Sequence, residues 1–168
     1  TEQELNLAIS LKLSKMLAQN GCPNVLTRED ENSIYTEGES IHEKKVSDIK
    51  RRIEIANHYD KIPLISIHMN TYPSKNVSGI QVFYSSKNVS STDLAQMMQN
   101  ALNEAFQPDN PRVIKTIPNN IYLFSHIENP SIIIECGFIS NKDELELLKD
   151  EIYQKNLAKV IADTLADS

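Results

Sequence analysis

The sequence predicts one α/β domain over residues 1–168, built on an open, twisted, mostly parallel sheet flanked by helices. Segments with helical periodicity alternate along the chain with short, wholly apolar segments of strand length. Strands that are apolar throughout are typical of sheets covered on both faces, and such sheets are mostly parallel. The sequence shows no internal repeat and no linker, and 168 residues suit a single domain with a sizeable core.

Five segments have the spacing of helices. In the first, residues 2–20, apolar side chains recur on one stripe, and Asn20-Gly21 is a typical helix end. That stripe consists of Leu5, Ile9, Leu13, Met16 and Leu17. The other helices are expected at 44–58, at 93–106 after an N-cap at Ser91 or Thr92, at 141–148 after Asn141, and at 152–165.

Short apolar segments predict the strands at 23–27, 63–68, 80–84, 121–124 and 130–136. The last of these is the most β-prone segment of the chain. Polar and proline-rich segments are expected to form loops. The segment 28–43 is the best candidate for a loop that covers a groove or contacts a partner.

Composition excludes several classes of function. The chain has 17 Lys+Arg and 23 Asp+Glu, so its net charge is −6, and its pI is about 5.2. This acidic balance, without any basic run, argues against nucleic acid as a partner. No apolar stretch approaches the ~18 residues of a membrane span. Cys22 and Cys136 do not form a disulfide framework, although a single bridge between them stays open.

Two of the predicted buried strands end in a titratable residue, His68 and Glu135. Active sites of open α/β sheets collect at the carboxyl ends of strands, so both side chains are well placed for chemistry. Glu2, in the first turn of a helix, is a third candidate. A purely structural role for each stays open. Cys136 alternates with Glu135 and therefore points to the opposite face. Three other histidines are expected at the surface: His42, His58 and His126.

Five segments together carry a resemblance that covers nearly the whole chain. They are Glu2-x-x-x-Asn6-Leu7-Ala8, Val25-Leu26-Thr27-Arg28, Arg52-Ile53-Glu54-Ile55-Ala56-Asn57, Ser66-Ile67-His68-Met69-Asn70 and Glu135-Cys136-Gly137-Phe138-Ile139-Ser140-Asn141. In this order the chain resembles the zinc-dependent N-acetylmuramoyl-L-alanine amidases of the type 3 group. The stretch from Tyr35 to Arg52 is most similar to their germination-specific, spore-cortex branch, called CwlD-like.

The resemblance implies a single zinc site. Glu2 and His68 match two of the family's metal ligands, and Glu135 matches its catalytic carboxylate. The third ligand is a histidine in a His-Gly-Gly segment on the family's first strand, upstream of the position of Glu2. The sequence contains no His-Gly pair. We therefore expect an N-terminally incomplete domain that lacks this strand, exposes one flank of its sheet and binds zinc weakly.

Further roles follow for residues near these positions. Asn70, Tyr122 and Phe138 are the candidates for contact with substrate, and core packing is the alternative for Phe138. Arg52 is expected to hold the sheet or an acidic residue.

The resemblance also implies a peptidoglycan hydrolase that acts outside the cytoplasm, at the cell wall or spore cortex. It would cleave the amide between the lactyl group of N-acetylmuramic acid and L-alanine. Three alternatives stay open: a peptidoglycan-binding pseudoenzyme, an amidase subunit activated by a protein partner, and a plain metallopeptidase.

Overall fold

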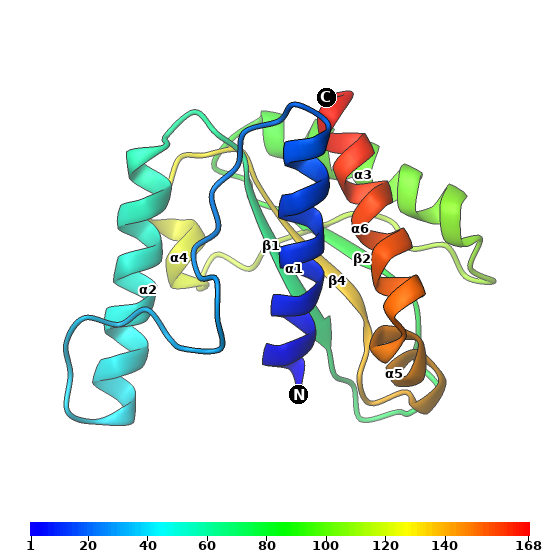
Figure 1. Cartoon of the computed structure of the whole chain (residues 1–168), viewed down its shortest axis with the longest axis horizontal. Coiled ribbons are helices and arrows are strands. Elements are labelled where there is room, and N and C mark those ends of the chain that lie inside the picture. Colours follow the sequence, from blue (N-terminus) through cyan, green and yellow to red (C-terminus); the bar gives the residue numbers. More distant parts are fainter.

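The computed structural model describes residues 1–168 as a four-stranded sheet with helices on both faces (Figure 1). The strands are β1 (Leu64–Asn70), β2 (Gln81–Tyr84), β3 (Lys115–Thr116) and β4 (Ser131–Phe138), in the spatial order β1-β4-β2-β3. The pairs β1–β4 and β2–β3 are parallel, whereas β2 runs antiparallel to β4. The predicted α/β fold with a mostly parallel sheet is confirmed, and β1 lies at one edge of that sheet.

The helices divide unequally between the two faces. One face packs against α1 (Glu2–Gln19), α3 (Ser90–Phe106), α5 (Lys142–Lys149) and α6 (Glu151–Ala166). The other face carries α2 (Ile41–His58) and the short α4 (Tyr122–Ser125). Figure 1 shows α1 and α6 side by side over the sheet, with α2 set apart from them. None of these helices is both long and apolar enough to cross a membrane.

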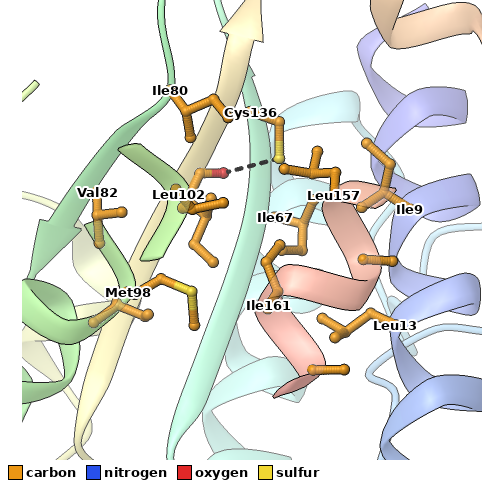
Figure 2. Packing of buried hydrophobic residues seen from close by; sticks show 14 of the residues in the cluster. Ile9, Leu13, Ile67, Ile80, Val82, Met98, Leu102, Cys136, Leu157 and Ile161 are labelled. Atoms are coloured by element: carbon orange, nitrogen blue, oxygen red, sulfur yellow. Dashed lines mark hydrogen bonds between the residues drawn. The ribbon is translucent and has the colours of Figure 1, made fainter. Parts of the chain in front are cut away.

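The main core lies between the sheet and the helices of the first face. Ile132, Ile134 and Cys136 alternate along β4 and are all buried in this core. Figure 2 shows Cys136 among the other buried side chains of this core. The predicted stripe of α1 also faces this core: Leu5, Ile9 and Leu13 are buried there, and Met16 and Leu17 pack against its margin. The Sγ of Cys136 lies 3.7 Å from the carbonyl oxygen of Ile134. Both cysteines are free thiols, so there is no bridge between them.

Two predicted strands are wrong. Residues 23–27 form no strand, because the Asn24 side chain ties this segment to the backbone of Ser14 and Cys22 and leaves it beside α1. Residues 121–124 were expected as a strand but lie in and beside α4, where Phe124 is buried in the smaller core on the second face. A short apolar segment is compatible with either a strand or a helix. Here the helix forms because it buries the ring of Phe124.

Helix starts also differ from expectation. The second helix begins at Ile41, because Ser40 and Glu43 form a capping box. The third helix begins at Ser90 without a side-chain cap. Ser91 does not cap it, because its hydroxyl accepts a hydrogen bond from the Ser131 N–H of β4.

Candidate active site

His68 and Glu135 are direct neighbours across the parallel pair formed by the edge strand β1 and β4. Their Cα atoms are partners in the β1–β4 register. Residues paired in this way project to the same face of a sheet, which here is the face of α2 and α4, opposite Cys136. The pairing of β1 with β4 therefore places the two titratable side chains next to each other on one face of the sheet.

Glu2 reaches this site from the first turn of α1. The helix begins there because Thr1 and Glu4 form a capping box. Glu2 Oε1 lies 3.2 Å from His68 Nδ1, and the Met69 N–H donates to the same oxygen at 3.3 Å. The Asn6 side-chain amide lies one helical turn on and donates to it at 3.5 Å. These contacts hold one carboxylate oxygen of Glu2 against the imidazole and leave the other free.

Glu135 is the electrostatically perturbed group of the site. Its Oε2 is buried and receives no hydrogen bond. Burial, and then the negative charge of Glu2, raise the pKa of Glu135 to about 7. A carboxylate with a pKa near neutrality exchanges protons readily at physiological pH, which is the property required of a general acid–base catalyst.

A groove of about 1510 Å³ opens beside the three residues. Its walls come from α1, α2 and α4, and residues of β1 contribute to its floor. Glu2, His68 and Glu135 all line it, and it also runs along the free edge of β1. The loop segment expected to cover a groove also contributes to it, through Arg28, Asn32, Ser33 and Tyr35.

The candidate substrate residues differ in their placement. Tyr122 lines the groove and is 48% exposed, with its ring stacked on that of His126. Asn70 lies at the end of β1, outside the groove lining, and its side-chain oxygen accepts from the N–H of Thr71. Phe138 is only 4% exposed and lies beneath the guanidinium of Arg112. The structure therefore brings Tyr122 to the site and does not bring Phe138 into the groove.

Arg52 has the structural contacts expected of it. It donates to the Asp48 carboxylate at 2.6 Å and to the Thr27 hydroxyl at 2.8 Å. The other oxygen of Asp48 accepts from the N–H of Ile34 at 2.8 Å. Arg52 thus fastens the segment 27–34 to α2. The three remaining histidines are exposed, as expected: His42, His58 and His126.

Two side chains of types that can bind a metal ion lie side by side in this site. Glu2 and His68 supply carboxylate and imidazole, which are ligand types that zinc accepts in hydrolases. All three buried side-chain atoms that lack a hydrogen-bond partner lie in residues of this groove: Asn6 Oδ1, Asn129 Oδ1 and Glu135 Oε2. No group of three or more His, Cys, Asp or Glu side chains in the chain is arranged to hold a metal ion. The residues therefore fit zinc as two ligands of a larger set.

Sequence reasoning missed two residues near the site. Asn6 was noted only as part of a segment, although its i+4 spacing from Glu2 signals a contact on one helix face. Glu144 was not singled out. Its carboxylate accepts hydrogen bonds from the N–H groups of Gly79 and Phe138, and the second of these lies just beyond Glu135.

Comparisons with known proteins agree with this geometry. The family model described as N-acetylmuramoyl-L-alanine amidase matches residues 1–167. The germination-specific N-acetylmuramoyl-L-alanine amidase of Bacillus subtilis (strain 168) is 31% identical over 161 residues, covering 95% of this chain and 67% of that protein.

Solved structures show the same relationship. The CwlD amidase of Clostridioides difficile, determined in complex with the GerS lipoprotein, superposes with a TM-score of 0.92 at 34% identity, covering 99% of this chain and 85% of that one. An N-acetylmuramoyl-L-alanine amidase from Clostridium difficile 630 gives a TM-score of 0.82 at 29% identity, covering 99% and 83%. Because the family model matches almost the entire length of this chain, the chain belongs to the N-acetylmuramoyl-L-alanine amidase family.

Proposed function

We propose that this chain is a zinc-dependent peptidoglycan hydrolase. Its substrate is the amide that joins the lactyl group of N-acetylmuramic acid to the L-alanine of the stem peptide. One observation carries the proposal: the Glu2–His68 pair lies beside the unpartnered carboxylate of Glu135 in an open groove. Membership of the amidase family supports the choice of this bond over a simple peptide bond.

In the proposed reaction Glu135 acts as the proton carrier. Its carboxylate takes a proton from a water molecule as the water oxygen bonds to the lactyl carbonyl carbon. The carbon–nitrogen bond then breaks, and Glu135 returns the proton to the leaving amine of L-alanine. The products are a glycan with a lactyl carboxylate and a stem peptide with a free amino terminus. A pKa of about 7 suits both transfers, because the group can be ionised before the first and protonated before the second.

Glu2 and His68 are the proposed zinc ligands of this chain. Bound zinc would supply Lewis-acid chemistry, which lowers the pKa of a coordinated water and stabilises negative charge on the carbonyl oxygen. The third ligand is proposed to be the histidine of a His-Gly-Gly segment upstream of residue 1. The contribution of the chain itself is orientation, since the Met69 N–H and the Asn6 amide fix Glu2 Oε1 next to the imidazole.

Tyr122 is the proposed substrate contact with the strongest support. It lines the same groove as Glu135, and the stacked ring of His126 limits its movement. Asn70 and Phe138 stay predictions of substrate contact. Asn70 would contact substrate at the end of β1, two residues beyond His68. The ring of Phe138 is buried, so it would affect substrate binding through packing.

The proposed cellular role is modification of the spore cortex, outside the cytoplasm. It is supported by the similarity to a germination-specific amidase and to CwlD. A protein partner that completes or stabilises the zinc site is a second proposal. It is supported by the solved CwlD amidase, which was determined in complex with a lipoprotein.

The decisive experiment is mass spectrometry of purified peptidoglycan after incubation with the chain carrying its upstream segment. Muramic acid with a free lactyl carboxylate, together with stem peptides that begin with a free L-alanine amine, is the expected result. Cleavage that persists in a strong chelator would contradict the zinc mechanism and leave the reaction intact. Cleavage seen only when a partner protein is added would support the partner-activated form. Binding of peptidoglycan without cleavage under any of these conditions would favour the pseudoenzyme.

A further inference from the structure

The segment that follows Glu135 is fastened to the loop that follows His68. We call residues 71–79, between β1 and β2, the post-β1 loop. Four hydrogen bonds join the segment 139–144 to this loop and to the residue before it. They run from Ile139 N–H to Asn70 O (2.9 Å), from Tyr72 N–H to Ser140 Oγ (3.0 Å), from Asn141 Nδ2 to Val77 O (3.3 Å), and from Gly79 N–H to Glu144 Oε1 (2.8 Å).

Glu144 differs from the other members of this set because it also holds the end of β4. Its Oε2 accepts from the N–H of Phe138 at 2.7 Å, while its Oε1 accepts from Gly79. One carboxylate therefore connects the strand that carries Glu135 to the far end of the post-β1 loop. Hydrogen bonds from N–H groups to an ionised carboxylate are stronger than those to a neutral acceptor.

The end of β4 needs such a connection because its ladder is interrupted there. The β1–β4 register passes from His68–Glu135 to Asn70–Phe138, so β4 contains one extra residue directly after Glu135. Gly137 lies within this bulge. A Cβ at that position would lie 3.3 Å from a methyl carbon of Leu148 and 3.5 Å from the carboxyl carbon of Glu144. The absence of a side chain thus lets α5 bring Glu144 close to the strand.

We propose that Glu144 is a positioning residue for the hydrolytic reaction, which holds the end of β4 and the post-β1 loop together so that Glu135 faces His68 at a fixed distance. This inference rests on the proposed function of Glu135. Glu144 touches neither substrate nor the reacting atoms. It acts through the backbone of Phe138, three residues beyond Glu135, and through the post-β1 loop, which begins three residues after His68.

The variant Glu144→Gln tests this inference. Glutamine has nearly the same size, but its one carbonyl oxygen can accept from only one of the two N–H groups at full strength. Displacement of a catalytic group by about 1 Å can cost about 100-fold in rate, so we expect kcat to fall by about 10- to 100-fold. We expect KM for a soluble muramoyl peptide to stay within about twofold, because the groove is unchanged.

Asp143→Asn is the matched control. Asp143 lies beside Glu144 in the first turn of α5 and is exposed, so this change removes the same charge from the same helix end. Backbone amide exchange should show faster exchange at Phe138 and Gly79 in Glu144→Gln and wild-type protection in Asp143→Asn. A kcat for Glu144→Gln equal to that of Asp143→Asn would overturn the inference, even if the thermal stability of the two differed.

Glu144→Asp keeps the test decisive if Glu144→Gln does not fold, because it retains the negative charge while its shorter side chain cannot reach both the Phe138 and the Gly79 N–H groups. A lower kcat at unchanged KM supports positioning by this set of bonds, and an unchanged kcat overturns it. If the wild-type chain carrying its upstream segment releases no stem peptide, the proposed function is contradicted instead. In that case amide exchange still tests whether Glu144 connects the end of β4 to the post-β1 loop. Loss of protection at Phe138 and Gly79 only in Glu144→Gln supports the connection. Retained protection at these two amides in that variant overturns it.

Discussion

Glu2 Oε1 lies 3.2 Å from His68 Nδ1, although 66 residues separate the two in the chain. The contact joins the start of α1 to the end of β1, and its carboxylate oxygen also accepts from the N–H of Met69. Both side chains remain nearly half exposed, at 41% for Glu2 and 45% for His68. The pair is therefore fixed in position and still accessible from the groove.

Glu2→Gln should weaken zinc binding selectively. Loss of a residue that merely supports a metal ligand costs about 10-fold or more in affinity, and loss of a ligand should exceed that. Competition with a chromophoric chelator measures the zinc affinity of the chain carrying its upstream segment. Glu4→Gln is the control, because Glu4 lies in the same helical turn and contacts only Thr1. Equal zinc affinities in the two variants would remove Glu2 from the ligand set.

Glu135→Gln should abolish turnover while zinc affinity stays nearly unchanged. Loss of a general base typically costs about 100- to 10,000-fold in rate. The amide of glutamine fills the same space but cannot take up a proton. Release of lactyl carboxylate from peptidoglycan, measured alongside zinc affinity, separates the two effects. Activity within about tenfold of the wild type would exclude Glu135 as the catalytic base.

The raised pKa of Glu135 predicts a pH-dependent difference in stability between metal-free wild type and Glu135→Gln. The pKa is about 7 in the folded chain against an ordinary value of 4.5, so the folded state holds this proton more tightly than the unfolded state. The stabilisation is complete below pH 4.5 and is lost as the pH rises through 7. The Tm of the variant should therefore rise relative to that of wild type across this range. Thermal unfolding in chelator at several pH values checks this, and a constant Tm difference would contradict it.

Tyr122→Ala should raise KM for a muramoyl peptide more than it lowers kcat. The ring lines the groove and stacks on that of His126, so its loss should leave the proton transfers at Glu135 intact. Steady-state kinetics on a soluble muramoyl peptide provides the measurement. Tyr59→Ala is a matched control at the part of the groove formed by the end of α2. A selective loss of kcat in Tyr122→Ala would point to a role in the chemical step.

Arg52→Ala should destabilise the fold by about 1.5–3 kcal/mol, the range for hydrogen bonds that involve charged groups. The change leaves the Asp48 carboxylate without its cation and frees the Thr27 hydroxyl. Urea unfolding measures the free energy of unfolding. Arg51→Ala is the control, since Arg51 makes an exposed ion pair with Glu54, and such pairs contribute about 1 kcal/mol or less. Equal losses in both variants would show that Arg52 does not fasten the segment 27–34.

Much of the fold could be predicted because its longer elements have clear periodicity. The apolar stripe of α1 and the apolar strands β1 and β4 follow directly from the sequence pattern. The errors fall where local contacts decide the conformation. Residues 23–27 are apolar enough for a strand, yet the side chain of Asn24 donates to the carbonyl oxygens of Ser14 and Cys22 and holds the segment beside α1. The early start of α2 had a readable signal in Ser40 and Glu43.

The site was predictable only in part, for a similar reason. His68 and Glu135 stand out because each ends an apolar strand, and the parallel pairing of these strands makes them neighbours. The contact of Glu2 with the Met69 N–H depends on how α1 lies against the edge of the sheet, which periodicity does not specify. The role of Glu144 depends on the bulge at Gly137, and a single extra residue in one strand leaves no mark on the apolar pattern.

The Met69 N–H also determines how far another strand can pair along the free edge of β1. The Leu64 N–H donates toward β4, to Pro130 O, so by alternation Ile65, Ile67 and Met69 turn their backbone groups to the outer side. Glu2 already occupies the N–H of Met69, and Ile65 and Ile67 remain available. The free pairing edge of β1 therefore ends at Met69, where its last outward N–H group is held by a side chain of the active site.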